Sequence, residues 1–283
     1  MTRRSDAAHR LEAAEDEVAG QADASLIHLF GRLGVVEARV RAAVDRRRAD
    51  DPDPNDRFRG LYISDAQVDG MLGGEPGPLV PGDTERAAAE TLAAVERRAD
   101  DDESAGSDLR LRRLARAFGL TPSDVELLLI ALAPDLDPRF ERLYGYLNDD
   151  VSRRRASTGL ALELAATGSA ARSGLSPGRA RLGPHRPLVA AGLVLVEEGE
   201  RPFLTRPLRV PDRVTAHLLG GDAPDPLVKE LLTDSIPAGL GEAQVLARAI
   251  ASGIPLAYVR ERPGSSGRSL ARAAFEAAGR PAV

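Results

Sequence analysis

The sequence predicts a mainly α-helical protein with one small β-hairpin and, towards its C-terminal end, a single strand, loop and helix. Three observations predict this fold class. Apolar residues recur at spacings of three and four, the period of an amphipathic helix, over most of the chain. Two short apolar runs flank the glycine-containing turn 197–200, as in a hairpin. The apolar run 254–259 leads into a Gly/Ser-rich stretch and then an Ala-rich stretch.

The composition limits the chemistry that the chain can carry. Its 283 residues are enough for two domains. Aromatic residues make up 4% and tryptophan is absent, so the core must be built from Leu, Val and Ala. The absence of cysteine excludes disulfides, cysteine-based zinc sites and thiol chemistry. The four histidines lack the spacing of metal ligands, and we predict no metal site.

The net charge and the hydropathy of the chain restrict the kinds of partner that it can bind. A net charge of −5 argues mildly against a nucleic-acid partner. No apolar run approaches the roughly 20 residues that a membrane span needs. The first residues are charged, unlike the start of a signal peptide. We therefore expect a cytoplasmic protein without membrane contact.

Residues 1–56 are predicted to form a helical arm. Residues 1–24 are rich in Ala and charge, so we expect frayed helix or disorder there. The following apolar residues form one helical stripe: Leu26, Phe30, Leu33, Val36, Val40 and Val44. A helix packed on its own domain is one interpretation, and an oligomerisation or partner helix is the other. The breaker cluster 50–55 is predicted to end the helix.

Residues 57–106 are predicted to be a helical segment and a linker. Ser64 and Gln67 have the spacing of a capping box. Residues 73–82 are rich in Gly and Pro, as linkers are. An Ala-rich helix is predicted over 84–98, followed by an acidic loop over 99–106. The four acids 100–103 lack the spaced glycine and distal glutamate of a calcium loop, so we interpret them as solvated linker.

Residues 107–220 are predicted to form a winged helix-turn-helix domain. Four helices are expected, at 109–118, 125–133, 138–147 and 157–166. Pro134 is predicted to end the second, which is apolar almost all round and therefore central. A helical turn at 188–191, a strand at 193–196, a returning strand at 202–205 and a short helix to Leu219 follow. Helices followed by a hairpin are the order of a winged helix, with the hairpin as its wing.

A winged helix suggests DNA binding, but the residues argue against it. The expected recognition helix, 157–165, carries no Arg, Lys, Asn or Gln to read base edges. Seven arginines could touch phosphates: Arg153, Arg154, Arg155, Arg172, Arg179, Arg181 and Arg186. We interpret them as solvated or partner-facing. The expected partner is another protein, or a second copy, bound through the helical arm and the winged helix.

The stretch 254–279 has the order of a phosphate-binding loop: strand, Gly/Ser-rich turn and helix. The full motif is G-x-x-x-x-G-K-[ST]. Arg262 stands at its first glycine and Arg268 at its lysine, whereas Gly267 and Ser269 fit. The residues predicted to contact nucleotide in this degenerate loop are Gly264, Ser265, Ser266, Gly267, Arg268 and Ser269.

Two long stretches carry a family resemblance: Leu111-Arg-Arg-Leu-Ala-Arg-Ala-Phe-Gly-Leu-Thr-Pro122 and residues 127–155. They resemble the N-terminal winged-helix region of a bacterial family of AAA+ ATPases, some of which accompany contractile injection systems. Residues 204–213 resemble the segment that closes that region. Residues 262–269 lie where the family's nucleotide loop begins.

The resemblance implies the N-terminal adaptor region of an ATP-binding protein, with 221–283 as a truncated P-loop module. Walker B acids, sensors and an arginine finger normally follow that loop, and this chain ends at Val283. We therefore predict no catalytic residue, no ATP hydrolysis and no tightly bound cofactor, whereas a full-length relative would use ATP and Mg²⁺. The alternative is a winged-helix DNA-binding regulator.

Overall fold

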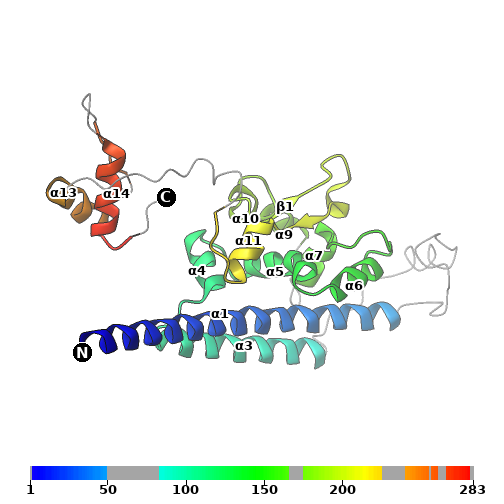
Figure 1. The fold of residues 1–283 in the computed structure, drawn as a ribbon. Coiled ribbons are helices and arrows are strands. Elements are labelled where there is room, and N and C mark those ends of the chain that lie inside the picture. The colour runs from blue at the N-terminus through cyan, green and yellow to red at the C-terminus, as the bar shows by residue number, and fades with distance from the viewer. Residues whose placement is uncertain are drawn as a thin grey trace. The chain divides into compact units, whose positions relative to one another are not determined.

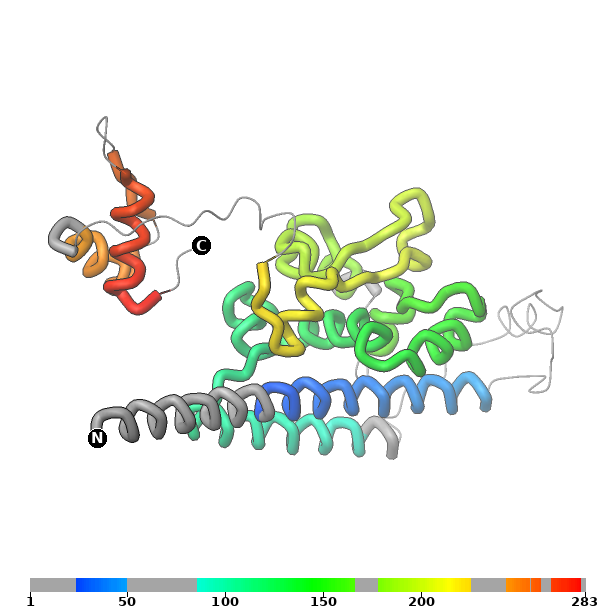
Figure 2. Tube along the Cα trace, viewed as in Figure 1, coloured from blue at the N-terminus to red at the C-terminus, as the bar shows by residue number. Residues whose placement is uncertain are grey.

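The computed structural model describes residues 2–49, 83–165, 175–224, 240–254, 256–260 and 266–280. Figure 2 follows the same chain as a tube, with residues of uncertain placement in grey. The chain divides into two compact units, Met1–Asp222 and Ala223–Val283. Three of the four predicted segments, 1–56, 57–106 and 107–220, lie in the first unit. The predicted capping box at Ser64 and the linker 73–82 lie outside the described residues.

Two long helices, α1 (Thr2–Ala49) and α3 (Asp83–Ser104), lie side by side along the first unit (Figure 1). They run antiparallel, because Gly31 lies against Val95 while Ala42 shares a pocket with Ala88. The structure extends both predicted helices: α1 begins at Thr2, and α3 continues through the expected acidic loop to Ser104. Acids at a helix C-terminus are unfavourable for the helix dipole.

Two arginines of the next helix offset that unfavourable charge. Arg112 donates hydrogen bonds to Asp100 at 2.7 Å and to Glu103 at 3.0 Å, and Arg116 donates to Glu103 at 2.8 Å. The last turn of α3 is therefore held by cations from another helix. The acids 100–103 are helical, and two of them pair with arginines of α4, which corrects the prediction of a solvated loop.

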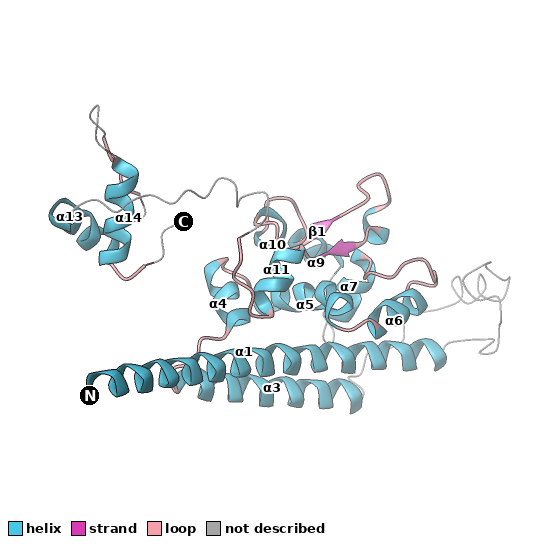
Figure 3. Cartoon of the chain, in the orientation of Figure 1, coloured by secondary structure: helices cyan, strands magenta, loops and turns pink. Residues whose placement is uncertain are grey.

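The four helices predicted for the middle of the chain are confirmed. They are α4 (Arg110–Ala117), α5 (Pro122–Leu136), α6 (Arg139–Leu147) and α7 (Thr158–Ala165). Thr121 starts α5 through a capping box with Asp124. Every residue from Asp124 to Pro134 is buried, so α5 is the central helix, as predicted (Figure 3).

Pro134 does not end α5, contrary to the prediction. Proline lacks the N–H that would bond the carbonyl of Ile130, four residues earlier. The Tyr144 hydroxyl of α6 donates to that carbonyl at 2.9 Å instead. Because the freed acceptor is satisfied from another helix, α5 continues to Leu136.

Short elements complete the first unit. They are α9 (Leu175–Arg181), α10 (Pro187–Ala190), β1 (Leu195–Val196), the 3₁₀ turn η1 (Phe203–Thr205), β2 (Leu208–Arg209) and α11 (Asp212–Leu218). Strands β1 and β2 pair antiparallel, with Leu195 opposite Arg209 and Val196 opposite Leu208. Ser157, before α7, bridges to Pro207 beside them.

The hairpin is confirmed, but its second strand is not where the sequence placed it. Residues 203–205 form a 3₁₀ turn, and the returning strand is Leu208–Arg209. Leu208 and Val210 are both buried, so the two-residue alternation of a half-buried strand begins there. The wing is consequently longer than predicted.

One hydrophobic core joins α1 to the winged helix. Leu29, Val36 and Val40 of α1 belong to the same buried cluster as Leu129 of α5 and Tyr144 of α6. The structure thus supports the interpretation of α1 as a helix packed on its own domain. None of the helices in the described part combines the length and hydropathy needed to cross a membrane.

The second unit contains α13 (Leu240–Ala251) and α14 (Gly267–Ala277), which share a small alanine-rich core. The strand predicted at 254–259 is wrong for the described residues. Residues 256–260 form neither helix nor strand, and Leu256 and Tyr258 are 87% and 90% exposed. A strand requires a neighbour to accept and donate its backbone hydrogen bonds.

Candidate functional site

The predicted nucleotide loop is described from Ser266 onwards, and Gly264 and Ser265 lie outside the described residues. Ser266 is the N-cap of α14, and its Oγ accepts the Ser269 N–H at 3.2 Å. The Ser269 hydroxyl also lies 3.0 Å from the Ser266 Oγ. Gly267 and Arg268 form the first turn with them. The structure groups these four residues at a helix N-terminus, and their binding of nucleotide stays a prediction.

The helix expected to read DNA is buried. Thr158, Leu160, Ala161, Leu162 and Leu164 of α7 are all buried, so this helix cannot enter a groove. In a helix-turn-helix the second helix is the one that enters the major groove. The next helix that the structure describes is α9, whose Gly178 lies close to Leu162 of α7.

The arginine cluster before α7 is paired with acids. Arg153 pairs with Asp150 at 3.0 Å, and Arg155 pairs with Asp135 at 3.2 Å. Arg154 lies 3.6 Å from Glu141. These cations are engaged within the domain, so a phosphate would have to displace a carboxylate from each of them.

The arginines of α9 are engaged as well. Arg181 donates to the Thr121 hydroxyl at 2.7 Å and to Asp124 at 3.3 Å. The Arg179 guanidinium lies over the Phe203 ring of the wing, 4.3 Å from its centroid. Arg172 lies outside the described residues. The wing therefore lies against α9.

The wing is also fixed to the start of α7. The Thr158 N–H donates to the Arg206 carbonyl at 2.8 Å, and the Thr158 hydroxyl donates to the Phe203 carbonyl. Gly159 lets α7 and the wing approach each other closely, because a Cβ there would lie 2.9 Å from the Leu204 carbonyl oxygen.

We expect Gly159→Ala to lower the free energy of unfolding by about 1 kcal/mol, because overpacking costs about 1–3 kcal/mol and a helical Gly→Ala change returns at most about 1. Gly34→Ala is the matched control: Gly34 lies in α1 with nothing within 4 Å of an added Cβ. That variant should be slightly stabilised. Urea unfolding measures both, and equal shifts in the two variants would contradict a backbone clash.

A buried ion-pair network joins α1 to α5. Glu126 of α5 accepts from Arg32 at 2.6 Å and from Arg39 at 2.7 Å, and all three side chains are largely buried. Arg39 also donates to the Leu164 carbonyl at 3.5 Å. The sequence analysis missed this cluster. The available signal was Glu126 itself, because a carboxylate inside an apolar helix needs a cation as partner.

The same network holds α3. Glu96 accepts from Arg32 and Arg112, each at 2.5 Å, and lies 3.3 Å from His28 Nε2. The hydrogen bond from His28, followed by those from Arg112 and Arg32, holds the pKa of the Glu96 carboxyl far below its ordinary range, against the opposing effect of burial. One carboxylate therefore connects α3 to both α1 and α4.

This depressed pKa predicts a pH dependence of stability. A carboxyl with a lower pKa in the folded state stabilises fully above its unfolded value, about 4.3, and loses that contribution as the pH falls further. The difference in unfolding midpoint between the wild type and Glu96→Gln should be constant above that value and shrink below it. Urea titrations from neutral to acid pH test this, and a difference that grows with acidification would contradict it.

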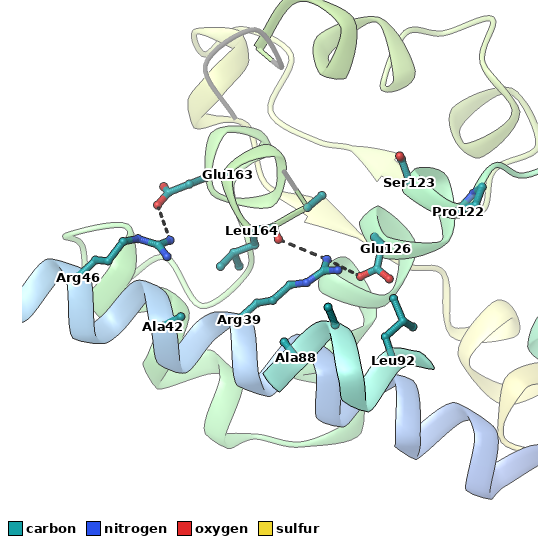
Figure 4. A pocket seen from close by; sticks show the side chains of 12 residues that line it. Arg39, Ala42, Arg46, Ala88, Leu92, Pro122, Ser123, Glu126, Glu163 and Leu164 are labelled. Carbon is teal, nitrogen blue, oxygen red and sulfur yellow. Dashed lines mark hydrogen bonds and ion pairs between the residues drawn. The ribbon is translucent and has the colours of Figure 1, made fainter. Parts of the chain in front are cut away.

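A pocket of about 360 Å³ opens where the two long helices meet the winged helix (Figure 4). Its apolar lining comes largely from small side chains: Ala42 of α1, Ala88, Ala89 and Leu92 of α3, and Leu164 and Ala165 of α7. Arg39 pairs with Glu126 beside it, and Arg46 lies 3.7 Å from Glu163 at its rim. We call this the interhelix pocket. Its volume lies within the range of ligand and anchor-residue pockets.

A second polar cluster lies at the end of the first unit. Asp222 accepts two hydrogen bonds from the Arg110 guanidinium, each at 2.7 Å. His217 Nδ1 lies 3.0 Å from Asp222 Oδ1. These bonds, that from Arg110 first, hold the pKa of the Asp222 carboxyl well below its ordinary range. In the described part of the chain, no three His, Asp or Glu side chains are grouped so as to hold a metal ion.

The helices α7 and α9 and the antiparallel wing that follows them define a winged helix domain. The family model described as "winged helix domain, variant" matches residues 11–232, and the chain belongs to this family. The matched region includes most of α1 and all of α3, consistent with their shared core. Neither the curated proteins nor the solved structures gave a match. Domains of this class bind proteins or DNA.

Proposed function

We propose that this chain is an adaptor whose winged helix domain binds another protein through the interhelix pocket. The observation that carries the proposal is the contrast between two surfaces. On the side of α7 and the wing, α7 is buried, the arginines at 153–155 pair with carboxylates and the Arg179 guanidinium lies over the Phe203 ring. Between the long helices and the winged helix, an apolar pocket is open.

The lining of the pocket favours one kind of partner. Four of its twelve lining residues are alanines and two are leucines, so the space beside the alanines suits a large apolar side chain of the partner. Four charged side chains also line the pocket. A buried apolar or aromatic anchor in a central pocket is the usual source of most of the binding energy in an interface. The ion pairs at the rim would surround such an anchor and exclude water. The preferred partner is therefore a peptide segment with one large apolar anchor.

Selection from a random peptide library displayed on phage tests this proposal. Selected peptides should share an aromatic or large aliphatic residue and should bind the wild type. Ala89→Trp, which fills the pocket, should weaken their binding at least tenfold, about 1.4 kcal/mol. The matched control is Ala94→Trp, also exposed on α3 but not in the pocket lining. Equal binding to the two variants would refute the pocket as the site.

The DNA-binding alternative is tested with a labelled 20-base-pair duplex. Phosphate-dominated binding falls steeply with salt. Under the adaptor proposal, fluorescence anisotropy should detect no saturable binding even at low salt. Tight, steeply salt-dependent binding that Arg179→Ala and Arg186→Ala weaken would instead support a DNA-binding regulator.

We further propose that the domain precedes a nucleotide-binding module of the AAA+ type, of the kind associated with contractile injection systems. Support comes from the resemblance over 111–155 and from the helix N-terminus at Ser266–Ser269 that follows the domain. A helix N-terminus presents N–H groups to phosphate. Arg268 in place of lysine and Arg262 in place of glycine argue for weak binding.

Calorimetry with ATP and Mg²⁺, together with a phosphate-release assay, tests this second proposal. We expect weak or undetectable binding and no magnesium-dependent turnover by the 283-residue chain. Sustained turnover would overturn the expectation of an inactive module.

A further inference from the structure

The chain leaves the first unit through a tightly fixed turn. After α11, the Gly220 N–H donates to the His217 carbonyl at 3.1 Å, and the Gly221 N–H donates to the Ala216 carbonyl at 2.7 Å. Gly220 has a φ of +103°, which favours glycine. This pattern is a Schellman motif, and it directs the chain back along α11. Arg213 secures it by donating to the Gly221 carbonyl at 2.9 Å.

The turn places Asp222 beside Arg110. Both oxygens of the carboxylate accept from the guanidinium at 2.7 Å, the two-point geometry that makes arginine–carboxylate pairs strong and directional. Arg110 also donates to the His217 carbonyl at 3.2 Å. The charged groups around the pair are His217 of α11 and Asp108 before α4. Asp222 is the last residue of the first unit, so this pair lies where the connection to the second unit begins.

Arg110 is itself held by α1. Its backbone N–H donates to the Ser25 hydroxyl of α1 at 3.0 Å. Leu109, the N-cap residue of α4, offers no side-chain cap, so Ser25 supplies from another helix the acceptor that the first turn of α4 needs. A single residue thus contacts α1 through its backbone and the exit of the chain through its side chain.

We propose that Arg110 is a positioning residue that couples α1 to the exit of the chain from the winged helix domain. Through it, a partner that shifts α1 alters the start of the connection to the C-terminal unit. Without it, Asp222 would keep only its contact with His217, besides the backbone turn that Arg213 secures. The coupling through Arg110 requires no ligand in the interhelix pocket, so its test is independent of the proposed function.

Spin labelling of the full chain tests the coupling. The native sequence has no cysteine, so a cysteine at Ala223 can be labelled alone. The label should be restrained in the wild type. Asp222→Asn and Arg110→Gln should shift its spectrum towards fast motion, and the charge exchange Arg110→Glu with Asp222→Arg should restore part of the restraint. An unchanged spectrum in Asp222→Asn would show that the pair of Arg110 with Asp222 does not restrain the chain.

Ser25→Ala tests the coupling itself. Ser25 is held to Arg110 and not to Asp222, so a gain in mobility at position 223 in this variant reports transmission through Arg110. No gain would overturn the coupling. Arg113→Ala is the control, because Arg113 pairs with Asp108 on the same helix end and should leave the label restrained.

A second label, at Ala94 on α3, reports whether the variants remain folded. Ala94 is exposed on α3, an element that supplies neither Arg110 nor Asp222 nor Ser25. Its spectrum should be the same in every variant. If Arg110→Gln changes it, the milder Arg110→Lys, which keeps the charge but loses the two-point geometry, gives the decisive comparison at position 223.

Discussion

Replacing Glu126 by alanine is expected to lower the free energy of unfolding of the first unit by about 3–5 kcal/mol, the usual effect of removing one partner from a buried ion pair. Glu126 is the shared acceptor of Arg32 and Arg39, and its side chain is only 8% exposed. Its removal leaves Arg39 buried without a carboxylate, and Arg32 with Glu96 alone. The loss then comes mainly from the arginines that remain.

The matched control is Glu163→Ala. Glu163 also lies at the interhelix pocket and also pairs with an arginine of α1, but it is 60% exposed. Exposed pairs contribute about 0–1 kcal/mol, so this variant should be nearly neutral. Urea unfolding followed by circular dichroism measures both. Equal losses in the two variants would contradict the role assigned to burial.

A triple variant tests whether the loss of stability comes from buried charges that are left unpaired. Arg32→Met, Glu126→Leu and Arg39→Met together replace Glu126 and its two cations by apolar side chains. Glu96 loses Arg32 and keeps Arg112 as its partner. Such replacements are often neutral or stabilising, because no charge is left unpaired. We expect most of the stability lost in Glu126→Ala to return. A triple variant weaker than the single one would indicate that the arginines are needed for other contacts.

Replacing Tyr144 by alanine is expected to cost a similar amount, about 3–5 kcal/mol for a large aromatic side chain in a core. Tyr144 is fully buried, and its ring meets Phe140 edge-on with centroids 5.8 Å apart. The hydroxyl donates to the Ile130 carbonyl that Pro134 leaves without its helical partner. Burial raises the pKa of Tyr144 well above its ordinary value, so the hydroxyl stays a donor.

A double-mutant cycle isolates the hydrogen bond. Tyr144→Phe alone should cost about 1–3 kcal/mol, because it leaves a buried carbonyl unsatisfied. In a Pro134→Ala background the helix supplies its own N–H to Ile130, and the same change should then cost much less. Thermal and urea unfolding of the four proteins give the coupling. Additive effects would contradict the compensation between tyrosine and proline.

Helical period was a reliable guide in this chain. The stripe of α1 from Leu33 to Val44 and the apolar α5 are set by residues close in sequence, and the four middle helices follow from the same pattern. Phe30, predicted to lie in the stripe, is 47% exposed, and Leu29 is buried in its place. The order of helices and hairpin likewise predicted the winged helix. What local pattern could not supply was the partner of each polar group. Glu126 finds Arg32 and Arg39 from 94 and 87 residues away.

The wrong predictions have the same cause: each was decided by a residue on another element of the chain. Pro134 was expected to stop α5, because the compensating hydroxyl lies on another helix. The returning strand of the wing was placed at 202–205, where η1 forms, and begins only where Leu208 meets the core. The acids at the end of α3 were assigned to a solvated loop, because Arg112 belongs to α4. The pairing of Arg110 with Asp222 spans 112 residues.

The long separation between α1 and its partners has a consequence for biosynthesis. Arg32 leaves the ribosome 94 residues before Glu126. At about 5–20 residues per second, the apolar face of α1 waits on the order of 5–20 s for the helix that covers it. During that interval the nascent chain presents Leu29, Val36 and Val40 to water or to chaperones. The rate of translation between α1 and α5 thus sets how long this apolar face stays uncovered.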